Sequence, residues 1–122
     1  PTILEGLTND ARICQEEIFG PVLVAMPFDD EASLLKEANN SVFGLAAGIW
    51  TRDYKRAYRI ARALEAGTIW INTYKLFSIS TPFSGWKESG MGREKGRLGI
   101  REYMQQKSLY WGLNDAPLAW AN

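Results

Sequence analysis

The sequence predicts an α/β fold in which a mostly parallel sheet is flanked by helices. Two strand–helix–strand units follow one another along the chain, and such units form parallel neighbouring strands joined by right-handed crossovers. The strand candidate at 22–28, VLVAMPF, shows little polar alternation, which is typical of strands covered on both faces. The candidate at 68–72, TIWIN, is rich in β-branched and aromatic residues, which favour strands.

The first half of the chain supplies two strands and one helix. A short strand is expected at 2–7, and a second at 22–28 after a Gly-Pro turn. Asp29 and Asp30 stand directly before an expected helix at 31–39, where short polar residues cap the free N–H groups of a first turn. One face of that helix carries three apolar residues, Ala32, Leu35 and Ala38.

The second strand–helix–strand unit begins with a strand expected at 46–51. Asp53 is the candidate N-cap of a helix that runs through Ala66, and Gly67 is expected to end it in the usual C-terminal position. The strand at 68–72 then leads into a long loop at 73–89. Ligands bind beyond the carboxyl ends of strands in open α/β sheets, and loops this long are usually functional or disordered.

The last third of the chain predicts a helix at 91–106 and a final strand at 107–113. Ser89 is a candidate cap for this helix. Each glycine inside it costs about 1 kcal/mol relative to alanine. Three of them at i, i+4 and i+7 are therefore expected to bring the helix backbone close to another element: Gly92, Gly96 and Gly99.

Composition excludes several kinds of site and partner. The 14 basic and 14 acidic side chains cancel, so the field that attracts nucleic acid or an anionic membrane is missing. Without histidine, neither a Ser–His nor a Cys–His nucleophile pair can form, and zinc sites of the Cys/His kind are excluded, so no metal is expected. Cys14, the one cysteine, is interpreted as structural and favours a cytoplasmic location. Because the chain opens with Pro1 rather than methionine, we expect a segment of a longer protein.

Two clusters could carry chemistry. In EEIFGP at 16–21, the carboxylate of Glu17 could accept both hydroxyls of a ribose while the Phe19 ring packs against a flat heterocycle. The alternative is an exposed acidic pair before a strand, with Phe19 as a core anchor. In the second cluster, aromatic residues of the long loop could line a pocket for an organic substrate or pack beneath the loop. Glu94 could relay protons if partly buried, or form a structural ion pair.

Four segments resemble the C-terminal part of the aldehyde dehydrogenase superfamily. They are EEIFGPV at 16–22, NNSVFGLAAGIWTRD at 39–53, LEAGTIWIN at 64–72 and PFSGWKESGMGREKG at 82–96. Each is weak or moderate alone, but four in the right order and spacing are specific. The sequence departs from the commonest pattern at Ser84, where the loop often has glycine, and in its tryptophan-containing tail.

The resemblance implies that 1–107 is the C-terminal portion of a catalytic domain and that 108–122 is an oligomerisation strand and tail. The full-length protein would use NAD or NADP to oxidise an aldehyde to a carboxylic acid through a cysteine thiohemiacetal and thioester. Its nucleophilic cysteine, general-base glutamate and oxyanion asparagine would lie outside this chain, so the chain alone is expected to be inactive. The segment 108–113 would join a sheet of a neighbouring subunit in a homo-oligomer.

The resemblance also implies roles for individual residues. Glu17 would bind the nicotinamide-side ribose, Phe19 would contact the nicotinamide, and Glu94 would relay protons from the general base. The aldehyde tunnel would be lined by residues of the long loop, namely Thr73, Tyr74, Phe77 and Phe83. The alternative is a non-catalytic oligomerisation or structural module of the same fold, which would pair with another chain through its final strand.

Overall fold

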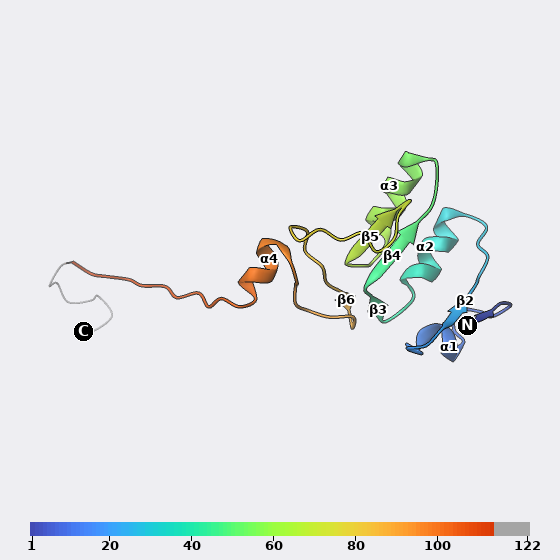
Figure 1. Cartoon of the computed structure of the whole chain (residues 1–122), viewed down its shortest axis with the longest axis horizontal. Coiled ribbons are helices and arrows are strands. Elements are labelled where there is room, and N and C mark those ends of the chain that lie inside the picture. Colours follow the sequence, from blue (N-terminus) through green and yellow to red (C-terminus); the bar gives the residue numbers. More distant parts are fainter. Residues whose placement is uncertain (114–122) are drawn as a thin grey trace, which may run out of the picture.

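The computed structural model describes residues 1–113, and its strands form three separate pairs (Figure 1). β1 (Thr2–Leu4) runs parallel to β2 (Val22–Val24), and β4 (Ala46–Ile49) runs parallel to β5 (Thr68–Ile71). The α/β class and the parallel neighbours are thus confirmed. Within the described residues, however, the pairs do not join into one continuous sheet.

A third strand pair is antiparallel and was not predicted. β3 (Phe43–Gly44) pairs with β6 (Trp86–Lys87), which lies inside the stretch expected to be an unbroken loop at 73–89. The amide of Glu88 extends this pairing by donating to the carbonyl of Val42 at 2.9 Å. The pair fastens the middle of the long loop to the chain that precedes β4.

The strands are shorter than predicted because left-handed residues turn the backbone at their ends. Gly6, with a φ of 72°, follows the end of β1, and the last hydrogen bond of this pair runs from the Ala25 amide to the Leu4 carbonyl at 2.8 Å. Asn72, with a φ of 53°, ends β5 in the same way. Its side chain then replaces the strand pairing by accepting from the Thr51 amide and donating to the Thr51 carbonyl, both at 2.9 Å.

The N-caps predicted for the helices at 31–39 and after Asp53 are confirmed, the first of them as Asp30 rather than Asp29. α2 (Glu31–Asn39) has the predicted bounds, and the Asp30 carboxylate accepts from the Ser33 amide at 2.7 Å. α3 (Tyr54–Ala63) begins after Asp53, whose carboxylate accepts from the Lys55 and Arg56 amides at 2.9 and 3.0 Å. Short acidic side chains satisfy the free N–H groups of the first turn in each case.

The predicted end of α3 is wrong, and Gly67 has another role. The helix stops at Ala63, and Leu64 is already extended. A Cβ added to Gly67 would lie 2.8 Å from the carbonyl carbon of Ser84, closer still to its oxygen, and 3.4 Å from Cα of Gly85. Glycine is therefore required because the loop backbone crosses directly over this position.

The C-terminal helix is also shorter than the predicted 91–106. α4 spans Gly96–Arg101, because Lys95 has a left-handed φ of 61° and the Glu94 backbone pairs with Phe83. Ser89 does not cap it: its hydroxyl accepts from the Gly44 amide at 2.9 Å. Among the described helices, which include the short α1 (Arg12–Gln15), none is long and apolar enough to cross a membrane.

The final strand predicted at 107–113 is not formed in the single chain. This segment runs away from the other elements without strand pairing, and Leu109, Tyr110 and Trp111 expose 80%, 93% and 79% of their surface (Figure 1). A strand needs a partner to satisfy its backbone, and this chain supplies none to the segment within 1–113. The rest of the expected tail, 114–122, lies outside the described residues.

Candidate functional site

Glu17 and Phe19 lie on the loop between α1 and β2. Phe19 adopts a left-handed φ of 52° and exposes 94% of its surface, so the alternative of a core anchor is wrong for this chain. Gly20 and Pro21 fix the loop behind it, since the Thr2 amide donates to the Pro21 carbonyl at 2.8 Å. A shallow hollow is lined by this loop together with apolar side chains of α1 and β2.

The two glutamates of this loop differ in their surroundings. The Glu16 carboxylate accepts from Nε of Arg12 at 2.6 Å, one turn back along the chain. Glu17 forms no ion pair within the part of the chain that the structure describes. A carboxylate accepts several hydrogen bonds and donates none when ionised, so Glu17 can accept from two neighbouring hydroxyls beside the exposed Phe19 ring.

The aromatic residues of the long loop form one cluster over β5. Phe77 packs edge-on against Phe83 with ring centroids 5.3 Å apart, and against Trp70 at 5.4 Å. Tyr74 packs edge-on against the other side of Trp70 at 5.3 Å. Aromatic pairs prefer this geometry. Thr73 follows Asn72 at the start of the same loop and is not part of the cluster.

Part of this aromatic cluster also lines a pocket beside β5. Trp70 is buried, and its indole N–H donates to the Leu76 carbonyl at 2.8 Å, which ties the loop to β5. A pocket opens between β5 and the loop, lined by Trp70, Phe77 and Phe83 among others. The packing of these aromatics is therefore observed. Phe77 and Phe83 also line a pocket and Tyr74 does not, and binding of a substrate there stays a prediction.

Trp70 and Lys95 belong to this site and were missed in the sequence. The Lys95 ammonium lies 4.2 Å from the ring centroid of Phe77 and 5.8 Å from that of Phe83, within the range of cation–π attraction. Trp70 is the one buried side chain of β5, and the apolar run IWI around it does not show which of its residues is buried. Nothing local to Lys95 predicts its place, because that depends on the left-handed turn into α4.

Glu94 lies at the edge of the aromatic cluster. Its amide donates to the Phe83 carbonyl at 2.9 Å, and the Phe83 amide donates back to its carbonyl at 2.8 Å. The Glu94 side chain is exposed and has no ion pair in the described range. Arg93 turns back instead, donating to the carbonyls of Met91 and Gly92 at 3.3 and 3.0 Å. The structural ion pair considered for Glu94 is therefore not formed within the described residues.

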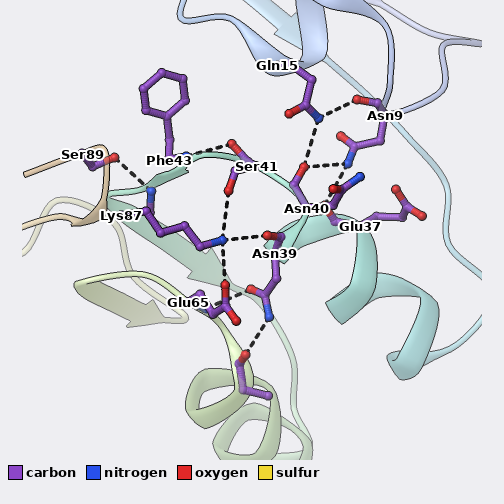
Figure 2. A network of polar contacts seen from close by, with 12 residues as sticks. Asn9, Gln15, Glu37, Asn39, Asn40, Ser41, Phe43, Glu65, Lys87 and Ser89 are labelled. Atoms are coloured by element: carbon purple, nitrogen blue, oxygen red, sulfur yellow. Dashed lines mark hydrogen bonds and ion pairs between the residues drawn. The ribbon is translucent and has the colours of Figure 1, made fainter.

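The structure brings the predicted residues together in two groups rather than one. Tyr74, Phe77 and Phe83 share the long loop and Glu94 pairs with Phe83, whereas Glu17 and Phe19 lie before β2. The hollow beside Phe19 and the aromatic pocket have no lining residue in common. The C-terminal turn of α2 receives hydrogen bonds from Asn9, which precedes α1, and from Lys87 of β6 (Figure 2). Residues 1–113 contain no group of three side chains that could hold a metal ion.

Comparison with known proteins gives a consistent match. The model of the aldehyde dehydrogenase family matches residues 1–109. An aldehyde dehydrogenase of Deinococcus radiodurans is 50% identical over 109 residues, covering 89% of this chain and 21% of the relative. A betaine aldehyde dehydrogenase of Mesorhizobium japonicum is 48% identical over 110 residues, covering 90% of this chain and 23% of the relative.

Solved structures agree with these relatives. A structure of an aldehyde dehydrogenase from Bacillus cereus in complex with NAD+ matches at a TM-score of 0.86 and 44% identity, over 92% of this chain and 23% of that one. A betaine aldehyde dehydrogenase from Staphylococcus aureus in complex with NAD+ matches at 0.92 and 35% identity, over 98% and 24%. The chain spans less than a quarter of the length of these relatives. From the family match over nearly its whole length, we conclude that this chain belongs to the aldehyde dehydrogenase family.

Proposed function

We propose that this chain is the C-terminal part of the catalytic domain of an NAD- or NADP-dependent aldehyde dehydrogenase. The observation that carries the proposal is the family match over residues 1–109, at less than a quarter of the length of relatives that are named aldehyde dehydrogenases. In the full-length protein, a cysteine outside this chain attacks the aldehyde. Oxidation of the thiohemiacetal gives a thioester, which water hydrolyses to the carboxylic acid.

Glu17 and Phe19 form the proposed cofactor wall. The unpaired Glu17 carboxylate accepts the two hydroxyls of the nicotinamide-side ribose, and the uncovered Phe19 ring offers an apolar face to the nicotinamide. The bound NAD(P)+ supplies the hydride acceptor. An exposed carboxylate and a ring two residues apart fit a sugar joined to a flat heterocycle, which supports this assignment.

The aromatic loop forms the proposed aldehyde wall. Thr73, Tyr74, Phe77 and Phe83 line the tunnel in this proposal, and Trp70 of β5 packs against Tyr74 and Phe77. Apolar walls with few polar groups favour organic substrates and exclude water. Glu94 stands at the edge of the cluster and is exposed in the single chain, so the partial burial expected of a proton relay is not met there. In this proposal the rest of the enzyme covers Glu94, which then passes protons from the general base.

The segment 108–113 is proposed to pair with a sheet of a neighbouring subunit in a cytoplasmic homo-oligomer. In the single chain this segment is extended and unpaired, and its apolar side chains are exposed. An unpaired apolar strand binds another strand edge through backbone hydrogen bonds. The same feature would serve a non-catalytic assembly module, so only turnover separates the two functions.

The decisive experiment measures aldehyde-dependent NAD(P)H formation. We expect turnover by the full-length protein and none by the isolated 122-residue chain. In the full-length protein, Glu17→Gln should raise the KM for the cofactor about tenfold, since hydrogen bonds to a charged group contribute about 1.5–3 kcal/mol. Glu5→Gln, at an exposed glutamate after β1, is the matched control and should change nothing. An inactive full-length protein, or an active isolated chain, would overturn the proposal.

A further inference from the structure

We propose that Lys87 is a positioning residue for the aldehyde wall, which it fastens to the C-terminal turn of α2. The inference rests on the proposed function and adds to it a residue that lies outside both walls. Lys87 belongs to β6, between Phe83 and Glu94 in the long loop. Its side chain keeps 26% of its accessible surface, so most of it is enclosed by protein.

The Lys87 ammonium uses all three of its N–H donors. Nζ donates to the Asn39 carbonyl at 2.7 Å and to the Ser41 carbonyl at 3.0 Å, and it pairs with Oε2 of Glu65 at 2.7 Å (Figure 2). The last carbonyls of a helix have no partner within the helix and carry partial negative charge. A lysine ammonium supplies hydrogen-bond donors to these carbonyls and a positive charge beside their partial negative charge. The Glu65 carboxylate balances the charge of the ammonium.

The backbone of Lys87 indicates that this side chain is needed where it stands. Lys87 has a left-handed φ of 52°, a conformation that glycine adopts without strain and that costs other residues about 1–3 kcal/mol. The turn nevertheless carries a lysine, and its ammonium reaches three acceptors. Two further hydrogen bonds beside it complete the attachment: the Glu88 amide donates to the Val42 carbonyl, and the Gly44 amide donates to the Ser89 hydroxyl.

The opposite side of the same turn holds the segment that leads to the cofactor wall. The Asn9 amide group donates to the carbonyls of Glu37 and Asn40 at 3.1 and 3.2 Å. The Gln15 amide group donates to the Asn40 carbonyl at 3.0 Å, directly before the loop that bears Glu17 (Figure 2). The segment that leads to the cofactor wall is therefore hydrogen-bonded to the α2 turn through the neutral amides of Asn9 and Gln15. The loop of the aldehyde wall is bonded to the same turn through the charged ammonium of Lys87.

The side chain of Asn39 makes this turn a rigid support. Its Nδ2 donates to the Ala63 carbonyl at 2.8 Å, and its Oδ1 accepts from the Glu65 amide at 2.9 Å. The turn is thus tied to the end of α3 independently of Lys87. Removing the Lys87 ammonium should loosen the loop where it contacts this turn, and should leave the support and the β3–β6 pairing in place.

The test compares Lys87→Met with wild type in the full-length protein. Two carbonyls and a carboxylate lose their donor, and the loop bearing Phe83 and Glu94 moves. A displacement of about 1 Å can cost about a hundredfold in rate, so kcat/KM for the aldehyde should fall about ten- to a hundredfold. The KM for NAD(P)+ should change less than twofold, because Asn9 and Gln15 still hold the other side.

Three variants separate positioning from general damage. Lys87→Arg keeps the charge and should recover most of the aldehyde kcat/KM. Lys36→Met, an exposed lysine on the same α2 helix, is the matched control and should resemble wild type. Gln15→Leu should affect the other substrate: the KM for NAD(P)+ should rise, and the KM for the aldehyde should stay unchanged. Equal losses for both substrates in Lys87→Met would mean that Lys87 only stabilises the fold, and would overturn the proposal.

A second readout does not depend on turnover. Amide hydrogen exchange in full-length Lys87→Met should speed up across 83–94 and stay unchanged across α2. Unchanged exchange in 83–94 would overturn the role of Lys87, whatever the activity. Wild-type protein that forms no NAD(P)H would instead overturn the proposed function, so the two failures are distinguishable.

Discussion

Replacement of Gly67 by alanine tests the close crossing of the long loop over the chain that enters β5. The new Cβ would lie 2.8 Å from the Ser84 carbonyl carbon, whereas ordinary van der Waals contact begins at 3.4 Å. The two backbones would have to separate by at least about 0.6 Å, and more to clear the Ser84 oxygen. Neither partner is a flexible side chain, so we expect a loss of about 3 kcal/mol in the free energy of unfolding.

The loss is measured by denaturant unfolding of the full-length protein with and without Gly67→Ala. Gly20→Ala is the matched control, because its Cβ would meet nothing closer than 3.9 Å and its φ is not left-handed. The control should stay within about 0.5 kcal/mol of wild type. Equal stability of the Gly67 and Gly20 variants would refute the crossing of the loop described above.

Three further outcomes are expected. Asp30→Ala removes the N-cap of α2 and should lower the free energy of unfolding by about 1 kcal/mol in a denaturant titration, and an unchanged midpoint would contradict the cap. Hydrogen bonds from Arg59, and then from Arg56, hold the pKa of Glu31 below its ordinary value. Its stabilisation is therefore present above that ordinary value and lost as pH falls through the lowered one, so thermal melts of wild type and Glu31→Gln should differ at neutral pH and converge in acid. The isolated chain, with 108–113 exposed, should form oligomers in light scattering, and a monomer at high concentration would argue against strand pairing.

The helices with local signals could be predicted from sequence, and the elements set by distant contacts could not. Asp30 and Asp53 each precede their helix and cap it, so α2 and the start of α3 follow from neighbouring residues. The start of α4 depends on pairing between Phe83 and Glu94, which leaves Lys95 in a left-handed turn. No local pattern reveals such a pairing, and the helix was therefore predicted too long.

The candidate site shows the same division. The sequence predicted that Tyr74, Phe77 and Phe83 lie together, because the end of β5 and the long loop after it can be recognised in the sequence. Lys95 and Lys87 were not recognised, since each reaches its partners only through a turn with positive φ. The roles of Glu17 and Phe19 stay predictions, to be decided by cofactor binding in the full-length protein.

The small interior of this chain has a consequence for how it unfolds. Among residues 1–113, the buried apolar side chains are Ala57 and Ile60 of α3 and Trp70 of β5, which lies beneath the aromatic loop. Three side chains exclude too little water to hold about a hundred residues against chain entropy. In the proposed full-length enzyme, α3 and β5 should therefore lose their structure only together with the polypeptide that covers them. α3, β5 and the polypeptide that covers them would then unfold in a single cooperative transition. Proteolytic cleavage that separates them would make each piece insoluble.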